Sequence, residues 1–170
     1  TGYATPINSS GTDFFKNITE VTWYTSWVNP TGTFTEAFKN CYGLRGQANF
    51  CNLWQYYGLD NGVFRNAFEN CYNLSGEVNF CRVHNMTNDC FASAFKNCRG
   101  ITGVNFANLK EIRGSSGAFV NAFYNCASLR DVVLGGPFYT TGSAYTSSGK
   151  FANAFSNCVS LERFQLPEHI

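Results

Sequence analysis

The sequence has few charged residues and no run of like charges. Only 14% of its 170 residues are Asp, Glu, Lys or Arg, and the formal net charge is +1. Such a chain lacks the basic patch or stripe with which nucleic-acid-binding proteins contact phosphate groups. It also lacks an apolar stretch of about 18 residues, the minimum for a membrane-spanning helix. We therefore expect neither a nucleic-acid partner nor a membrane span within these residues.

Residues that serve catalysis and metal binding are also scarce. The two histidines, His84 and His169, lie near no Ser or Cys in a nucleophile motif. The acidic residues have no fixed spacing, so no carboxylate pair for glycoside cleavage can be nominated. No Gly-rich phosphate loop follows a strand, and the paired Cys-x-x-Cys or His spacing of a zinc site is absent. We expect a non-enzymatic protein without a cofactor or a metal ion.

The chain also has no initiator Met and no signal peptide. It begins at Thr1, so we expect a mature fragment or one domain of a longer protein. Its 170 residues are a single-domain length, and 44% hydrophobic residues with 17 Phe are enough for a continuous core.

What the sequence does contain is one pattern repeated five times, F-x-x-A-F-x-N-C-x-x-[L/I]. The copies begin at Phe34, Phe64, Phe91, Phe119 and Phe151, at intervals of 27 to 32 residues. A period of that length is typical of a solenoid, in which each repeat forms one coil and stacks on its neighbours. A decayed copy without cysteine lies at 14–23. We therefore predict one solenoid domain, in which residues 1–33 form a degenerate N-terminal capping repeat before the five copies in 34–170.

Each copy predicts a short helix followed by a strand. The first Phe, the Ala, the second Phe and the Cys fall at i, i+3, i+4 and i+7, which is one face of an α-helix. The Asn before each Cys is predicted to end that helix, because Asn tolerates left-handed backbone. A short alternating run follows, and such alternation predicts a half-buried strand. Stacked coils then form an α/β solenoid, with a parallel β-sheet on one face and short helices on the other. The outward strand positions are Thr22, Asn49, Asn79, Asn105, Val133 and Gln165.

These units resemble the BspA-type leucine-rich repeat, a class marked in each unit by an Ala-Phe pair, a Gly or Asn, a Cys and a Leu. The residues that carry the resemblance are A-F-x-N-C-x-x-L followed by x-x-V-x-[FL], and they recur over nearly the whole chain. The strands here hold Phe and Val where leucine is more usual, and the unit is longer and more variable than the commonest form. The resemblance implies a right-handed leucine-rich-repeat solenoid of five to six coils.

The eight cysteines divide into two groups. Five belong to the motif and are predicted to fill the core as free thiols, because equivalent positions on neighbouring helices lie about 8 to 10 Å apart and a disulfide needs Cα atoms within about 7 Å. Cys51 and Cys81 each follow an inward Phe in strands about 4.8 Å apart, which leaves open a disulfide or two semi-buried thiols. A bridge between them would indicate an oxidising compartment. Cys90 has no predicted partner. The five motif residues are Cys41, Cys71, Cys98, Cys126 and Cys158.

Two sets of side chains are candidates for ligand binding. The outward strand positions hold Asn49, Asn79 and Asn105, which could bind a ligand or merely hydrogen-bond to one another and to water. All three Trp lie in the first third of the chain, and large aromatic side chains are favoured interface anchors and sugar-stacking platforms. Core packing at the N-terminal end is the alternative for Trp23 and Trp54. The predicted exposed aromatic patch consists of Tyr24, Trp54, Tyr56 and Tyr57.

The family resemblance also implies a function. Proteins with BspA-type repeats are typically secreted or surface-exposed and bind host proteins or other cells. We therefore expect an extracellular or cell-surface recognition or adhesion module that binds a host or cell-surface protein, or a glycan, through its solenoid surface. Two alternatives stay open. One is a structural or receptor-contacting domain of a larger fibre, virion or envelope assembly, and the other is an accessory carbohydrate-binding domain attached to an enzyme.

Overall fold

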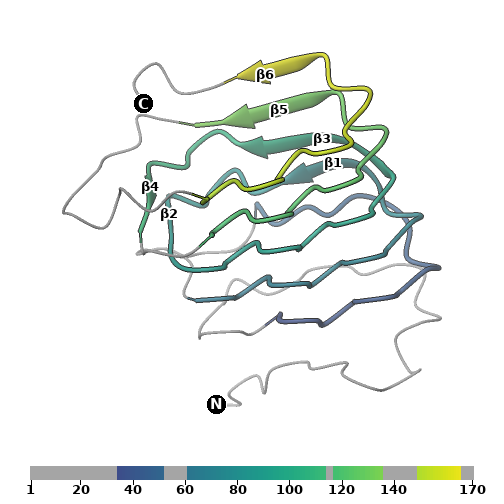
Figure 1. Ribbon diagram of the computed structural model, residues 1–170, viewed down its shortest axis with the longest axis horizontal. Coiled ribbons are helices and arrows are strands. Elements are labelled where there is room, and N and C mark those ends of the chain that lie inside the picture. The colour runs from purple at the N-terminus through teal and green to yellow at the C-terminus, as the bar shows by residue number, and fades with distance from the viewer. Residues whose placement is uncertain (1–33, 52–60, 114–116, 136–148, 166–170) are drawn as a thin grey trace.

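The computed structural model describes residues 34–51, 61–113, 117–135 and 149–165, which form coils stacked one on the next (Figure 1). Four strands form a parallel sheet in the order β1-β3-β5-β6, and β2 and β4 form a second parallel pair. The predicted parallel sheet is therefore present. The strands are β1 Ser75–Asn79, β2 Asn85–Met86, β3 Gly100–Phe106, β4 Glu111–Ile112, β5 Asp131–Leu134 and β6 Arg163–Gln165.

Equivalent repeat positions lie side by side in the main sheet. Val78 of β1 pairs with Val104 of β3, which pairs with Val132 of β5, and all three side chains are buried. The neighbouring residues of each strand point to the opposite, outward face, as period-two alternation requires. The first described coil joins the edge of this sheet at two isolated parallel bridges, Gly46 with Leu74 and Asn49 with Asn79.

The described residues contain no α-helix, so the predicted layer of short helices is wrong for them. Each motif copy consists instead of overlapping turns, with left-handed residues four positions apart. In the second copy these are Asn66 and Asn70, whose φ angles are 55° and 65°. An α-helix needs φ near −63° at every residue, so it cannot pass through such a segment. The equivalent pairs are Glu36 and Asn40, Ser93 and Asn97, Asn121 and Asn125, and Asn153 and Asn157.

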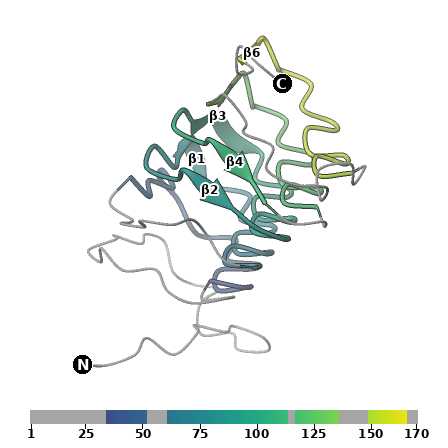
Figure 2. The same cartoon turned by 90° about the vertical axis from the view of Figure 1, so that its left-hand side faces the viewer.

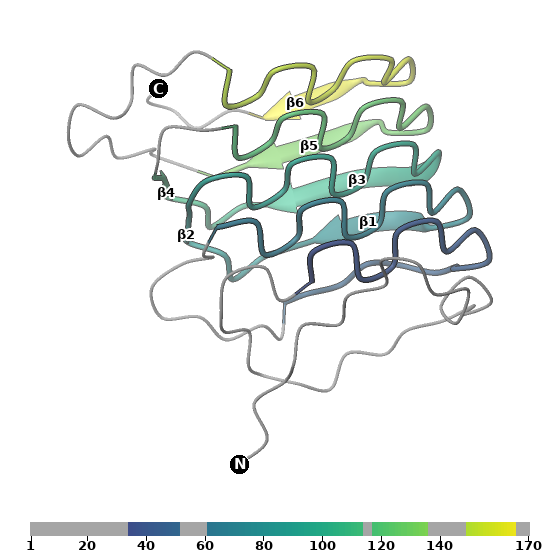
Figure 3. The same ribbon diagram turned by 60° about the horizontal axis from the view of Figure 1, so that its bottom comes forward.

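We call these segments the turn layer; it comprises residues 34–41, 62–71, 90–98, 118–126 and 149–158. Within a coil, an N–H group donates to the carbonyl three residues earlier, as Ala67 N does to Phe64 O at 3.0 Å. Alternating N–H groups donate instead to the following coil, as Phe64 N does to Cys90 O at 2.8 Å. The backbone bonds between described coils of the turn layer all run in this one direction. The turn layer and the main sheet lie on opposite sides of each coil (Figure 3).

A ladder of carboxamide groups also runs along the turn layer. Nδ2 of Asn70 donates to Oδ1 of Asn40 at 2.8 Å, and Nδ2 of Asn97 donates to Oδ1 of Asn70 at 2.7 Å. Asn125 continues the ladder by donating to Asn97 at 2.9 Å. The left-handed backbone predicted for this Asn is present, although no helix ends there. Its side chain instead links each coil to the next.

Columns of Phe rings fill the space between the turn layer and the main sheet. The ring of Phe64 stacks on Phe34 and on Phe91, with centroid distances of 5.1 and 5.2 Å. Phe80, the residue after β1, contacts Phe64 edge-on with a centroid distance of 5.1 Å. The turn layer therefore packs on the sheet through aromatic contacts that repeat at each level. The columns are Phe34-Phe64-Phe91-Phe119-Phe151, Phe38-Phe68-Phe95-Phe123-Phe155 and Phe50-Phe80-Phe106.

The pair of short strands β2 and β4 lies apart from the main sheet (Figure 2). It pairs Met86 with Ile112, and both side chains are buried. Glu111 of β4 is also buried, and its carboxylate lies 2.8 Å from the guanidinium of Arg113. These strands extend the core along a further side of the coils.

Candidate binding surface

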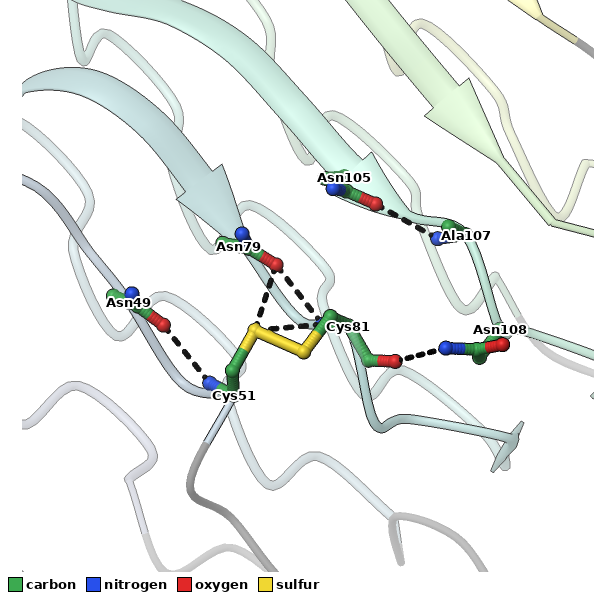
Figure 4. The surroundings of a disulfide bond; sticks show 7 residues. All are labelled: Asn49, Cys51, Asn79, Cys81, Asn105, Ala107 and Asn108. Carbon is green, nitrogen blue, oxygen red and sulfur yellow. Dashed lines mark hydrogen bonds between the residues drawn. A yellow bond between two sulfur atoms is a disulfide. The ribbon is translucent and has the colours of Figure 1, made fainter.

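Asn49, Asn79 and Asn105 form a row on the outward face, where successive levels of the main sheet end (Figure 4). Each carboxamide oxygen accepts a hydrogen bond from the backbone N–H two residues later, which closes an Asx turn. The turns at Asn79 and Asn105 lie where β1 and β3 end. The donors are Cys51 N at 3.0 Å, Cys81 N at 3.1 Å and Ala107 N at 3.0 Å.

The Asx turns use the Oδ1 atom of each carboxamide and leave its Nδ2 group available for a ligand. The oxygens bond to backbone rather than to a neighbouring Asn, and within the described ranges no acceptor is bonded to the three Nδ2 groups. Each Nδ2 carries two N–H donors. Asn49 is exposed, while Asn79 and Asn105 are half-buried. The row therefore offers fixed hydrogen-bond donors at roughly the 4.8 Å spacing of neighbouring strands.

The surface around the row is polar and carries charges of both signs. In the sheet register, Asn105 is followed by Val133 of β5 and Gln165 of β6. The next outward column holds an ion pair between Asp131 and Arg163, and the hydrogen bond from Arg163 lowers the pKa of the Asp131 carboxyl. No single sign of charge dominates this face. It suits a ligand recognised by hydrogen bonds more than one recognised by its net charge. The full column is Glu77, Gly103, Asp131 and Arg163.

A disulfide joins Cys51 and Cys81 beside the Asn row, with Cα atoms 5.1 Å apart. Sγ of Cys51 also lies 2.9 Å from Oδ1 of Asn79. Nδ2 of Asn108 donates to the carbonyl of Cys81 at 2.5 Å, which ties the next level to the same place. The disulfide and this hydrogen bond therefore connect the three chain segments that directly follow Asn49, Asn79 and Asn105.

The motif cysteines pack in the core as free thiols. Cys98, for example, is fully buried, and its Sγ donates to Phe68 O of the preceding coil at 3.0 Å. Burial raises the pKa of these thiols, to about 11 for Cys41. The thiolate, which is the nucleophile and the metal ligand, is therefore scarce at neutral pH. Cys90 is also a buried thiol, and Thr87 N lies 3.3 Å from its Sγ. The free motif thiols are Cys41, Cys71, Cys98 and Cys126, which are buried, and Cys158, which is partly exposed.

The aromatic residues Tyr24, Trp54, Tyr56 and Tyr57 lie outside the described residues, so that patch stays a prediction. Within the described ranges, no group of three or more His, Cys, Asp or Glu is arranged to hold a metal ion. No helix in that part of the chain has the length and apolarity needed to cross a membrane.

Sequence reasoning missed a second exposed row, which consists of Tyr42, Tyr72 and Arg99. The two Tyr rings stack with centroids 5.4 Å apart, and the residues are 45% and 42% exposed. The Arg99 guanidinium lies 5.5 Å from the Tyr72 ring centroid, within the range of a cation–π contact. All three directly follow a motif cysteine. Aligning the copies on Cys and comparing the next position would have found them.

Comparison of the chain with protein-family models, with curated proteins and with solved structures finds no match. The function of the chain has therefore to be inferred from its own residues and their geometry.

Proposed function

We propose that this protein is a non-enzymatic recognition or adhesion module that binds a glycan or a surface protein through the outward face of its main sheet. The observation that carries the proposal is the row of Asn49, Asn79 and Asn105. Their oxygens are held by Asx turns, so their Nδ2 donors are oriented before any ligand arrives. Binding groups that are already ordered lose little conformational entropy on association. Hydroxyl and carbonyl oxygens of a glycan or a polypeptide are the matching acceptors.

Two further observations support this proposal. Tyr42 and Tyr72 add exposed aromatic surface of the kind that interfaces and sugar-binding sites use. The disulfide between Cys51 and Cys81 favours an oxidising compartment, and we therefore propose an extracellular or cell-surface location. The repeat pattern agrees with a secreted or surface protein of the BspA-type leucine-rich-repeat class. No cofactor is required for such binding.

The test uses a substitution that removes a donor and keeps the turn. In Asn79→Asp, the remaining carboxylate oxygens can still accept the Cys81 N–H, but the Nδ2 donor is gone. Arrays of glycans and of surface proteins identify a ligand, and calorimetry then measures its affinity. We expect Asn79→Asp to weaken binding about tenfold, since a lost hydrogen bond of about 1.4 kcal/mol corresponds to that factor.

The matched control is Ser75→Asp, which adds the same charge to the same strand at its opposite, exposed end. It should bind like the unchanged protein. Equal weakening by both variants would indicate a general charge effect and contradict a role for the Asn row. A ligand whose affinity is unchanged in Asn79→Asp would also contradict it.

One observation favours a second function, a structural unit of a larger fibre, virion or envelope assembly. The last described coil, residues 149–165, exposes apolar side chains, with Val159 83% and Phe164 41% exposed. Electron microscopy of the purified protein at rising concentration distinguishes the two functions. Ordered assemblies would favour the structural role, and dispersed particles that bind a glycan or surface protein would favour recognition.

A further inference from the structure

The last described coil exposes side chains that the preceding coils bury. Phe91 and Phe95 of the third motif copy are both fully buried, whereas Phe151 and Phe155 at the same positions of the last copy are partly exposed. Val159 follows the motif cysteine of that coil and is 83% exposed. The apolar residues of this coil therefore have the same sequence pattern as the others but less cover.

The described ring columns end at this coil. Phe91 stacks on Phe64 and on Phe119, with centroid distances of 5.2 and 5.5 Å. Within the described ranges, Phe151 stacks on one ring only, that of Phe119 at 4.9 Å. Among the residues that the structure describes, one face of the Phe151 ring therefore lacks the stacking partner that each interior ring of the column has. Among the described strands of the main sheet, β6 likewise has a neighbour on one side only, which is β5.

The directional hydrogen bonds of the turn layer reach the same point. Each preceding coil donates alternating N–H groups to the next, and the fourth motif copy donates to carbonyls of residues 150, 152, 154 and 156 at 2.8 to 2.9 Å. The corresponding N–H groups of the last coil have no acceptor among the described residues. The last coil thus presents a row of donors at intervals of two residues. These donors are the backbone N–H groups of Phe151, Asn153, Phe155 and Asn157.

These features together specify the chemistry of what would cover this end. The partner must bring carbonyl oxygens at two-residue spacing, aromatic rings for both columns and a strand that adds to β6. A coil with the F-x-x-A-F-x-N-C motif, running in the same direction, meets all three requirements at once. Two copies of the protein docked by their last coils would instead face N–H groups with N–H groups, so the hydrogen-bond direction disfavours that arrangement.

We propose that the last coil is a docking site for one more coil of the same repeat class, supplied from outside residues 1–170 and docked in the same chain direction. The five motif copies within these residues already stack on one another and leave none to fill the site. Docking would bury the rings of Phe151 and Phe155 and satisfy the donor row. The solenoid would then continue across the junction without a change of register.

The experiment appends such a coil to the full chain. One protein carries a second copy of residues 117–135 after Ile170 through a Gly/Ser linker, and its control carries the same residues in reversed order. Linkers of about 10 and about 20 residues ensure that reach does not limit docking. Amide hydrogen exchange measured by NMR reports on the donor row directly. We expect exchange at Asn153, Phe155 and Asn157 to slow at least tenfold with the forward coil only.

Other outcomes would overturn the proposal. Equal protection by the forward and reversed coils would mean that the last coil binds any apolar segment, whatever the direction of its chain. No protection with either linker would mean that the last coil binds no further coil. Protection in the unmodified protein that rises with concentration, with a dimer seen by sedimentation, would make a second copy the occupant. Phe155→Asp in the forward fusion should abolish the protection, and retention of protection would contradict the assigned contact.

Discussion

Asn97 combines backbone strain and side-chain hydrogen bonding at one position, so its substitution tests the turn layer most directly. Its φ of 66° lies in the left-handed region. Its Nδ2 donates to Asn70 at 2.7 Å, and its Oδ1 accepts from Asn125 at 2.9 Å. Asn97→Ala removes both ladder bonds and forces a Cβ-bearing residue without a polar side chain into left-handed backbone. Asn97→Gly removes the same bonds without that strain.

The two costs can be separated. A net hydrogen bond contributes about 1 kcal/mol, so losing two costs about 2 kcal/mol. Left-handed backbone costs an ordinary residue about 1 to 2 kcal/mol. We therefore expect Asn97→Ala to lower the free energy of unfolding by about 3 to 4 kcal/mol. The loss in Asn97→Gly should be smaller than the loss in Asn97→Ala by at least about 1 kcal/mol, because Gly adopts left-handed backbone without strain.

Urea denaturation followed by circular dichroism measures both variants, and Asn157→Ala is the control. Asn157 has the same left-handed backbone, with φ of 62°, but its Nδ2 makes one long bond of 3.3 Å to the Tyr124 hydroxyl. Asn157→Ala should therefore lower the free energy of unfolding by little more than the cost of the backbone strain. If Asn97→Ala and Asn97→Gly destabilised equally, the strain argument would be wrong. If Asn157→Ala cost as much as Asn97→Ala, the ladder would contribute nothing measurable.

Three further predictions concern the core, the disulfide and the thiols. Phe95→Ala should lower the free energy of unfolding by about 3 to 5 kcal/mol, and Phe155→Ala by much less because that ring is already partly exposed. Equal losses of the two variants in urea titration would contradict the argument that Phe95 is the better packed ring. Reducing the Cys51–Cys81 disulfide, which spans 30 residues, should cost up to about 3.5 kcal/mol by loop entropy, and Cys81→Ser should abolish any effect of the reductant on thermal unfolding. The pKa of Cys41 is raised from 9.0 to about 11, so the folded state keeps a proton that the unfolded chain releases; stability should be full below pH 9 and fall between pH 9 and 11. The stability of Cys41→Ala should fall less steeply over that pH range than the stability of the unchanged protein. An identical slope for the two proteins would contradict the assignment of the fall to Cys41.

The coils and the sheet could be predicted from the sequence because their signals repeat. The alternation around Val78 and Val104 recurs at each level, and parallel stacking follows from the equal order of elements in each repeat. The helix could not be distinguished from a chain of turns by apolar spacing, since both place the two Phe, the Ala and the Cys on one side. The better signal was Asn66 four residues before Asn70, a spacing that Asn121 and Asn125 repeat. Two residues suited to left-handed backbone within one turn argue against a helix.

The candidate site could be predicted only in part. Alternation places Asn79 and Asn105 on the outward face, but it does not say what their side-chain atoms bond to. The Asx turns depend on where each strand ends, and apolar spacing locates strand ends poorly. The row of Tyr42 and Tyr72 was missed for a different reason: it follows the motif cysteine, where the copies differ in residue type. Variable positions between fixed ones are therefore the place to look for binding residues in this chain.

The one-way hydrogen bonds of the turn layer have an electrostatic consequence. In the second copy, the carbonyl of Val63 accepts from the preceding coil while the N–H of Phe64, in the same peptide group, donates to the following coil. The dipole of that peptide group therefore points along the axis of the stack, and the peptide groups with the same bonding in other coils point the same way. Aligned peptide dipoles add, as they do in a helix. Among the described coils, partial positive charge therefore lies at the last coil and partial negative charge at the first, so carboxylates are attracted to the last coil and ammonium groups to the first.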